Sequence, residues 1–192
     1  MVISLQIKKI VALCKKRKLV TLYETKDEVQ WLGDGIAIYP LYDMPCFTAD
    51  LFCSLYDITD KQSEKIAFQI SDMPSTVDVS DAVENETQCE VIDISIYFGG
   101  KRLIPIKTSE GIVYIDKEHL APIGDLEMDM VFFFERNTDG HRYIVVKCGF
   151  NVVAILVPQP VITEKFCETL KEIAELTEAR RHNMKEANAI NG

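Results

Sequence analysis

The stretch DKEH at 116–119 carries the side chains of this sequence that are best suited to acid–base or metal chemistry. On one helical turn, residues three apart share a face, so Asp116 and His119 would form a carboxylate–imidazole pair, with Glu118 beside them. A catalytic metal needs three protein ligands as a rule, and a single pair does not supply them. The alternative is a capped helical turn after the apolar segment 112–115, with Asp116 as the N-cap. We favour the capped turn and expect neither a metal nor a cofactor.

Cys148 is the cysteine with the strongest case for reactivity, because Arg142 and Lys147 are near it in sequence and cations lower the pKa of a thiol. No His or Asn can be identified as its partner, and a half-buried strand cysteine is the commoner case. Cys46 and Cys53 are too far apart for a usual zinc knuckle. The six cysteines are widely spaced and no export signal precedes them, so we interpret them as reduced thiols of a cytoplasmic protein. We therefore expect no catalytic residue and no enzyme activity.

A basic run near the start of the chain, IKKIVALCKKRK at 7–18, holds six Lys or Arg residues in a protein of formal net charge −9. Apolar residues recur through it at helical spacing and predict an amphipathic helix over 3–17, with a stripe of Ile3, Ile7, Ile10, Val11 and Cys14. The basic side chains form the outer face of that helix. Five of them are candidate contacts to nucleic acid: Lys8, Lys9, Lys15, Lys16 and Lys18.

The other interpretation of this basic face is that it is simply solvated. The pI of ≈ 4.9 argues against a protein that coats DNA in general. For a single copy of the chain we favour the solvated face, since a DNA-facing surface would need several such helices gathered by oligomerisation.

A dense aromatic cluster, Trp31 with the segment YPLY at 39–42, is close in sequence to the turn GDG at 33–35. Aromatic rings beside a basic helix can stack on bases, and the N–H groups of a tight turn can face an anion. On alternating strands such rings more often belong to the core. We favour core positions for the aromatics and an ordinary turn for GDG.

Strands make up most of the elements that must position these residues. Segments rich in β-branched and aromatic residues, separated by turn-forming pairs such as Gly99-Gly100, predict antiparallel β-meanders. The strands are expected at 19–24, 29–32, 36–41, 65–70, 94–98, 101–107, 112–115, 130–136, 141–149 and 151–158.

Two further helices are expected. Thr48 can cap a short middle helix over 48–58, whose inward-facing residues are Leu51, Phe52, Leu55 and Tyr56. A long C-terminal helix starts at Thr163, frays after about Arg181, and has an apolar stripe of Phe166, Leu170, Ile173, Ala174 and Thr177. The fold class that follows is α+β.

The segment 71–93 contains seven acidic residues and no Lys or Arg, which favours a domain boundary or an exposed crossover. It divides the chain into residues 1–75, the N-terminal helix with one β-rich module, and residues 90–192, a second β-rich module with the C-terminal helix. The stretches 18–34 and 102–116 follow a similar residue pattern, so the two modules could be duplicates. One continuous domain is the alternative.

The second β-rich half, from RLIPIKTSEGIVYIDKEHL to KCGFNVVAILVP, resembles the domains of DNA sliding clamps, the ring-forming processivity factors. The matching features are a β-meander with a short helix inserted after YIDKEHL and paired strands that end in VVAILVP. FQISDMPS, in the first half, looks like the segment that closes a clamp module. The resemblance implies a basic helix that faces DNA inside an assembled ring, a role that helix 3–17 would take. In style the chain is also similar to small prophage-encoded proteins.

The sequence departs from the clamp pattern at two points. A clamp module carries two well-formed helices, whereas DKEHL spans barely one turn and the second basic helix is missing. The long C-terminal helix has no counterpart in that pattern. Both departures weaken the expectation of a DNA-encircling ring.

Three functions follow as hypotheses. We favour a non-enzymatic interaction or accessory domain, phage-related in style, that binds another protein or self-associates through the helix from Thr163. The alternative is a clamp-like, DNA-associated replication accessory protein that uses the basic face of helix 3–17. An enzyme built on Cys148 or on the Asp116 and His119 pair comes third. No apolar run reaches the roughly 20 residues that a membrane helix needs, so we expect no membrane partner.

Overall fold

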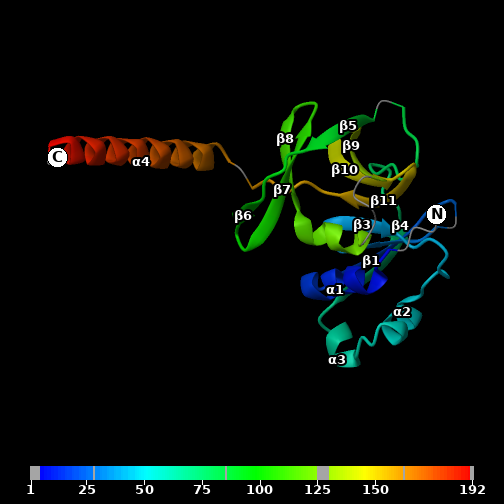
Figure 1. The fold of residues 1–192 in the computed structure, drawn as a ribbon. Helices are drawn as coiled ribbons and strands as arrows, with labels where there is room; N and C mark the ends of the chain where they lie inside the picture. Colours follow the sequence, from blue (N-terminus) through cyan, green and yellow to red (C-terminus); the bar gives the residue numbers. More distant parts are fainter. Residues whose placement is uncertain (1–4, 28, 85, 125–129, 162, 191–192) are drawn as a thin grey trace. The chain divides into compact units, whose positions relative to one another are not determined.

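The structure, a computed structural model, describes residues 5–27, 29–84, 86–124, 130–161 and 163–190, the last ten of them as backbone only. The chain divides into two compact units, Met1–Gln159 and Pro160–Gly192. The first unit contains the sheet and the shorter helices, and the second contains the helix α4, Glu164–Ile190 (Figure 1). The expected α+β class with an N-terminal, a short middle and a long C-terminal helix is confirmed.

Among the described residues, eleven strands join in one sheet. Their bounds are β1 Leu19–Glu24, β2 Trp31–Gly33, β3 Ala37–Pro40, β4 Ala67–Asp72, β5 Thr87–Val91, β6 Ile96–Phe98, β7 Lys101–Thr108, β8 Gly111–Asp116, β9 Val131–Thr138, β10 His141–Cys148 and β11 Asn151–Leu156. The strand order is β4-β1-β2-β3-β11-β10-β9-β5-β7-β6, and β8 pairs with β7 off this path. Asp34 follows β2 and Asp116 ends β8. These two residues are therefore positioned by strands of the same sheet.

Most neighbours in the sheet are antiparallel, as the meander pattern predicts, and β4 is the exception. It pairs parallel with β1, from Leu19 opposite Ala67 to Glu24 opposite Asp72. A parallel partner requires a crossover, and the chain between β3 and β4 supplies one that includes two helices, α2 (Ala49–Leu55) and α3 (Asp60–Ser63). The helix α3 was not predicted, because it is only one turn long.

The helix α1 spans Ile7–Arg17 and packs against β1 and the 3₁₀ helix η1, Lys117–Ile123 (Figure 1). It begins at Ile7, later than the expected range, because Gln6 has non-helical angles (φ −82°, ψ 78°) and its N–H donates to the carbonyl of Pro122 at 2.8 Å. Residues 3 and 4 of the expected helix lie outside the described residues. Its buried residues are Ile10, Val11, Leu13 and Cys14, which confirms three members of the expected stripe and adds Leu13. Ile7 is half-buried, and Ile3 lies outside the described residues. Lys18 ends the helix in a left-handed conformation with φ 58°.

The middle helix α2 begins where the capping pattern predicts, with Thr48 Oγ1 accepting from the N–H of Leu51. Its inward face is narrower than expected, since Leu51 and Leu55 are exposed and only Phe52 is fully buried. The Phe52 ring packs edge-on against Phe47 and Phe68, each at 5.7 Å between centroids. A two-turn helix held mainly by one aromatic residue leaves Leu51 and Leu55 in solvent.

Both faces of the central strands are covered. Along β10, Ile144 and Val146 belong to the core under α1, whereas Tyr143 and Val145 pack in a second core with Trp31. The second core is closed by residues 73–84 and Glu86, which we call the covering segment. Its Asp78 N–H donates to the Tyr143 hydroxyl at 2.8 Å, so part of the stretch expected as an exposed crossover lies on the sheet. The last residues of that stretch form β5, which the sequence analysis missed because only Cys89 of its side chains is buried.

The covering segment also buries two cations. Arg136 and Lys147, on β9 and β10, are 3% and 4% exposed, and the Glu86 carboxylate contacts both. Arg136 donates to Glu86 Oε2 through Nε and Nη2 at 2.9 and 2.7 Å, and through Nη1 to the carbonyl of Asp78 at 2.8 Å. The positive charges on this face are therefore paired within the unit.

Candidate anion-binding cleft

Three elements surround a cleft of ≈ 860 Å³ in the first unit: α1, η1 and the turn between β6 and β7. Two of the described lining residues are carboxylates, Asp116 and Glu118. Six are cations, which gives the lining an excess of four positive charges in a chain whose net charge is −9: Lys9, Lys16, Arg17, Lys101, Arg102 and Lys117. A concave surface lined by one sign of charge concentrates ions of the opposite sign.

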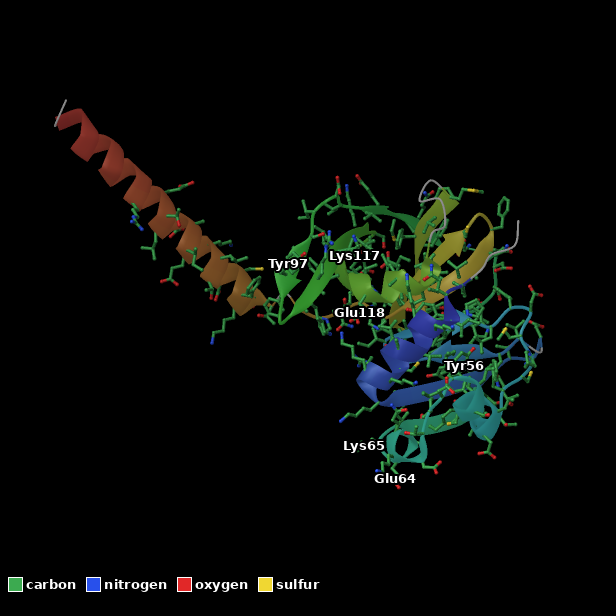
Figure 2. All side chains as sticks on the ribbon, turned by 60° about the horizontal axis from the view of Figure 1, so that its bottom comes forward. Tyr56, Glu64, Lys65, Tyr97, Lys117 and Glu118 are labelled. Carbon is green, nitrogen blue, oxygen red and sulfur yellow. The ribbon has the colours of Figure 1, made fainter. Side chains whose placement is uncertain are left out.

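The α1 side of the cleft follows from helical spacing. Lys9 and Lys16 are seven residues apart and so lie on one face, away from the buried stripe of Ile10 and Cys14. The ammonium of Lys16 lies 2.6 Å from Glu118 Oε2 on η1, which ties the two helices together at the rim of the cleft. Figure 2 shows Lys117 and Glu118 side by side on η1.

The η1 side is set by its cap. Asp116 Oδ1 accepts from the N–H of Glu118 at 3.1 Å, so Asp116 is the N-cap that the sequence predicts. The other interpretation, in which Asp116 pairs with His119, is wrong, because His119 binds the carboxylate of a different residue. Its Nε2 lies 2.8 Å from Oδ2 of Asp34, which comes from the turn after β2.

Asp34 and His119 form a buried pair at the base of the cleft, with side chains 0% and 4% exposed. A carboxylate only accepts, so Nε2 carries the proton in this contact. Asp34 Oδ1 accepts from the N–H groups of Ile36 and Ala37, both at 2.9 Å. Burial raises the pKa of Asp34, but the hydrogen bonds from His119, Ala37 and Ile36 outweigh burial, and the pKa lies below its ordinary value.

Two more hydrogen bonds fix the positions of Asp34 and His119. The Tyr39 hydroxyl donates to the carbonyl of His119 at 2.7 Å, and Arg17 Nε donates to the carbonyl of Asp34 at 3.0 Å. Arg17 Nε is also 3.7 Å from Asp34 Oδ2, so one cation of the cleft rests on the pair. Nδ1 of His119 is buried and has no hydrogen-bond partner among the described residues.

The third side of the cleft is the hairpin turn at Gly99 and Gly100, with φ of 56° and 78°. Positive φ at both turn residues suits a tight hairpin and favours glycine. The turn brings Lys101 and Arg102 to the cleft, and both have neutral partners. Lys101 Nζ donates to Gln159 Oε1 at 2.9 Å, and Arg102 Nε donates to Ser95 Oγ at 3.1 Å.

The lining cations therefore differ in how far their charge is compensated. Lys16 and Arg17 have carboxylates beside them, whereas Lys101 and Arg102 bind neutral oxygens. Within the described part of the chain, neither Lys9 nor Lys117 has an ion pair, and both are exposed. An anion entering the cleft would meet four cations that have no carboxylate partner among the described residues.

The five lysines predicted as nucleic-acid contacts lie in different surroundings. Lys9 and Lys16 line the cleft, and Lys8 is exposed outside its lining. Lys15 is half-buried and donates to the carbonyl of Tyr56 at 3.0 Å, and Lys18 is the exposed C-cap. The role of all five in nucleic-acid binding stays a prediction.

Four cations of the cleft were missed by the sequence analysis: Arg17, Lys101, Arg102 and Lys117. The signals were present, since Arg17 belongs to the basic run, Lys117 lies inside DKEH, and KR follows the glycine pair. The sequence does not show how the strands and helices are arranged, and this arrangement brings positions 17, 102 and 117 to one cleft. Hydrogen-bonded pairing across the sheet is long-range information that local spacing does not carry.

The other candidate residues lie elsewhere. Trp31 and Tyr39 are 2% and 0% exposed, which confirms their predicted core positions. Cys148 is buried at 3% exposed, and none of the six cysteines forms a disulfide. No group of three or more His, Cys, Asp or Glu residues placed to hold a metal occurs in the described part of the chain. No described helix is long and apolar enough to cross a membrane.

No protein-family model, curated protein or solved structure matches this chain. The resemblance to sliding-clamp domains and to prophage-encoded proteins stays a prediction.

Proposed function

We propose that this protein is a non-enzymatic binding module that holds the phosphate backbone of a nucleic acid in the cleft between α1, η1 and the β6–β7 turn. The observation that carries the proposal is the gathering of six cations around one hollow of an acidic chain. A nucleic-acid backbone presents a regular row of negative charges, and proteins bind it by neutralising several phosphates with Lys and Arg.

The proposal develops the DNA-associated alternative of the sequence analysis, with one change. There, several copies of the basic helix had to assemble before they could face DNA. Here the cations come from three elements of one unit, so a single copy presents a positive surface. A ring-forming, clamp-like role in replication is a finer version of the same proposal and needs assembly in addition.

The test is the salt dependence of binding, measured by fluorescence anisotropy with a labelled oligonucleotide over a series of KCl concentrations. For single strands, log affinity falls against log salt with a slope of about −0.7 per neutralised phosphate. Lys9→Glu combined with Lys117→Glu removes the two cations that have no ion pair. We expect this variant to bind at least about tenfold more weakly, with a slope shallower by about 1.4.

The matched control is Lys26→Glu combined with Lys65→Glu, two exposed lysines outside the cleft lining. It changes the net charge of the protein by the same amount, so it isolates position from total charge. We expect the control to bind nearly as well as the unaltered protein. Equal losses in the two variants, or no binding by the unaltered protein, would overturn the proposal.

A second candidate function, association with another protein, is supported by α4 itself. Its apolar residues Leu170, Ile173 and Leu176 are 48%, 54% and 65% exposed. An amphipathic helix with an exposed apolar stripe is typical of a surface that docks on a partner. This was the favoured function of the sequence analysis, and the partner is either a second copy or another protein.

Light scattering after size exclusion tests whether α4 joins two copies. We expect Leu170→Glu combined with Ile173→Glu to lower the measured mass to that of one chain. Lys171→Gln combined with Glu175→Gln, at exposed polar positions of the same helix, is the control and leaves the mass unchanged. A single-chain mass for the unaltered protein would exclude self-association and leave only a different partner for α4.

A further inference from the structure

Tyr97 is a large aromatic residue that the unit leaves in solvent beside the cleft. It lies on β6 (Figure 2), in the strand before the lining turn of Gly99 and Gly100, and it is not itself a lining residue. Its side chain is 75% exposed. In the β6–β7 hairpin it is directly opposite Arg102, one of the lining cations. Side chains of directly opposed residues lie on the same face of the sheet with Cβ atoms about 4.5–5.5 Å apart. The side chains of Tyr97 and Arg102 therefore leave the hairpin on the same face, next to each other at their bases.

Other tyrosines of the same unit have structural contacts. The Tyr39 hydroxyl donates to the carbonyl of His119, the Tyr42 hydroxyl donates to that of Val152, and the Tyr143 hydroxyl accepts from the N–H of Asp78. Among the described residues, none holds the ring or the hydroxyl of Tyr97. The ring is therefore available to a ligand, next to the position of a cation that lines the cleft.

Arg102 has little freedom beside this ring. Its Nε donates to Ser95 Oγ at 3.1 Å, which fixes the side chain to the hairpin, and its terminal nitrogens have no hydrogen bond to a described residue. A nucleotide likewise carries a flat aromatic base and a phosphate as close neighbours. The pair of Tyr97 and Arg102 matches that arrangement, with the ring for the base and the guanidinium for the phosphate.

We infer that the ligand of the cleft is a single-stranded nucleic acid, and that one of its bases stacks on Tyr97 while the adjoining phosphates lie among the cations. The inference rests on the proposed function and narrows it. In a duplex the faces of the bases are covered by their neighbours, so a protein ring reaches a base face only in a single strand. Stacking tolerates every base, so the site binds with little sequence preference.

The experiment compares three variants of the full chain with the unaltered protein, using a labelled oligothymidylate. Tyr97→Ala removes the stacking surface and is expected to weaken binding roughly fivefold to 150-fold, the range measured for one stacked base. Tyr97→Phe keeps the ring and is expected to bind like the unaltered protein. Phe150→Ala removes an aromatic that is 90% exposed outside the cleft lining and is expected to have no effect.

Competitors then separate the base from the charge. Unlabelled oligothymidylate should displace the probe far better than a duplex of equal length or free thymidine monophosphate. Heparin, a polyanion without bases, should bind equally well to Tyr97→Ala and to the unaltered protein, which also shows that the variant is folded. Duplex competing as well as the single strand, free nucleotide competing as well as the oligomer, or unaltered binding by Tyr97→Ala would each overturn the inference.

The two proposals fail in distinguishable ways. If stacking is absent but the cleft binds phosphates, Lys9→Glu combined with Lys117→Glu still weakens the binding of both oligonucleotide and heparin. The Tyr97 variants then bind both ligands like the unaltered protein. If the cleft binds no polyanion, heparin and oligonucleotide are both unaffected by reversing these lysines.

Discussion

Arg136 and Lys147 lie beneath the covering segment, whereas Lys9 and Lys117 border the cleft, and the two pairs differ in what surrounds them. The first pair is almost fully buried and shares the carboxylate of Glu86, and the Lys147 ammonium is also 4.5 Å from the centre of the Phe134 ring. The second pair is exposed and has no ion pair within the described residues. The same residue types therefore stabilise the fold in one region and leave unbalanced charge in the other.

The net charge of a short stretch of sequence does not predict whether its charges are neutralised in the fold. The covering segment belongs to the stretch 71–93, which has seven acidic residues and no Lys or Arg, and one of its carboxylates neutralises cations of the sheet. The basic run of α1 keeps much of its charge because, among the described residues, only Lys16 and Arg17 of the run have carboxylates beside them. A charged residue stabilises the fold when it is buried together with a partner of opposite charge. A charged residue that is exposed and has no such partner can bind a ligand.

The largest effect is expected when Glu86 is removed. Glu86→Ala leaves Arg136 and Lys147 buried without a carboxylate, and removing one partner of a buried ion pair costs about 3–5 kcal/mol in the free energy of unfolding. Urea denaturation followed by circular dichroism measures it. Glu84→Ala, an exposed acid of the same segment, should change stability by less than about 0.5 kcal/mol. Similar values for the two variants would show that the buried cluster does not hold the covering segment.

A smaller loss is expected at the base of the cleft. Asp34→Asn removes the charge that accepts from His119 and from two backbone N–H groups, and hydrogen bonds to charged groups contribute about 1.5–3 kcal/mol each in mutational series. We expect the free energy of unfolding to fall by about 2 kcal/mol, because the amide retains part of these contacts. Loss below about 0.5 kcal/mol would contradict a structural role for the buried pair.

The stability difference between the unaltered protein and Asp34→Asn should depend on pH in one direction. The pKa of Asp34 is lowered by folding, so its charge stabilises the folded state above the unfolded carboxyl pKa of about 3.9. The difference should therefore be constant from neutral pH down to about pH 4 and shrink as the pH falls through the lowered pKa. A difference that grows on acidification would contradict the assignment.

The smallest effect is expected at the rim. Glu118→Gln breaks the ion pair with Lys16, whose side chains are 42% and 65% exposed, so the free energy of unfolding should change by less than about 1 kcal/mol. The variant also removes a negative charge from the cleft and releases a cation. We expect oligonucleotide binding to strengthen about two- to fivefold in anisotropy titrations. Glu64→Gln, an exposed acid outside the cleft, is the control, and a weaker affinity for Glu118→Gln would count against the cleft.

Local patterns predicted much of the fold. Apolar spacing placed α1, the cap at Thr48 placed α2, and the glycine pair placed the β6–β7 hairpin. The errors arose where distant contacts decide the outcome. Gln6 lies outside the helix and its N–H donates to the carbonyl of Pro122. The strand β4 pairs parallel with β1, and a crossover connection makes this possible.

The candidate site was predictable only in parts. Asp116 as an N-cap and two lysines of the cleft were recognised, since caps and helix faces are local features. The pairing of His119 with Asp34 joins residues 85 positions apart, and that of Arg136 with Glu86 joins residues 50 apart. Tyr97 gave no local signal, because an exposed aromatic on a short strand looks the same in sequence as a buried one.

Hydrogen–deuterium exchange of the full chain with and without oligothymidylate tests the central claim most directly, because it reports on both cation regions in one experiment. We predict slower exchange on binding in peptides covering 96–103 and 116–121, with no change over 78–84 or 141–148. Protection confined to the covering segment and β10, or no protection around the cleft at saturating oligonucleotide, would contradict the account.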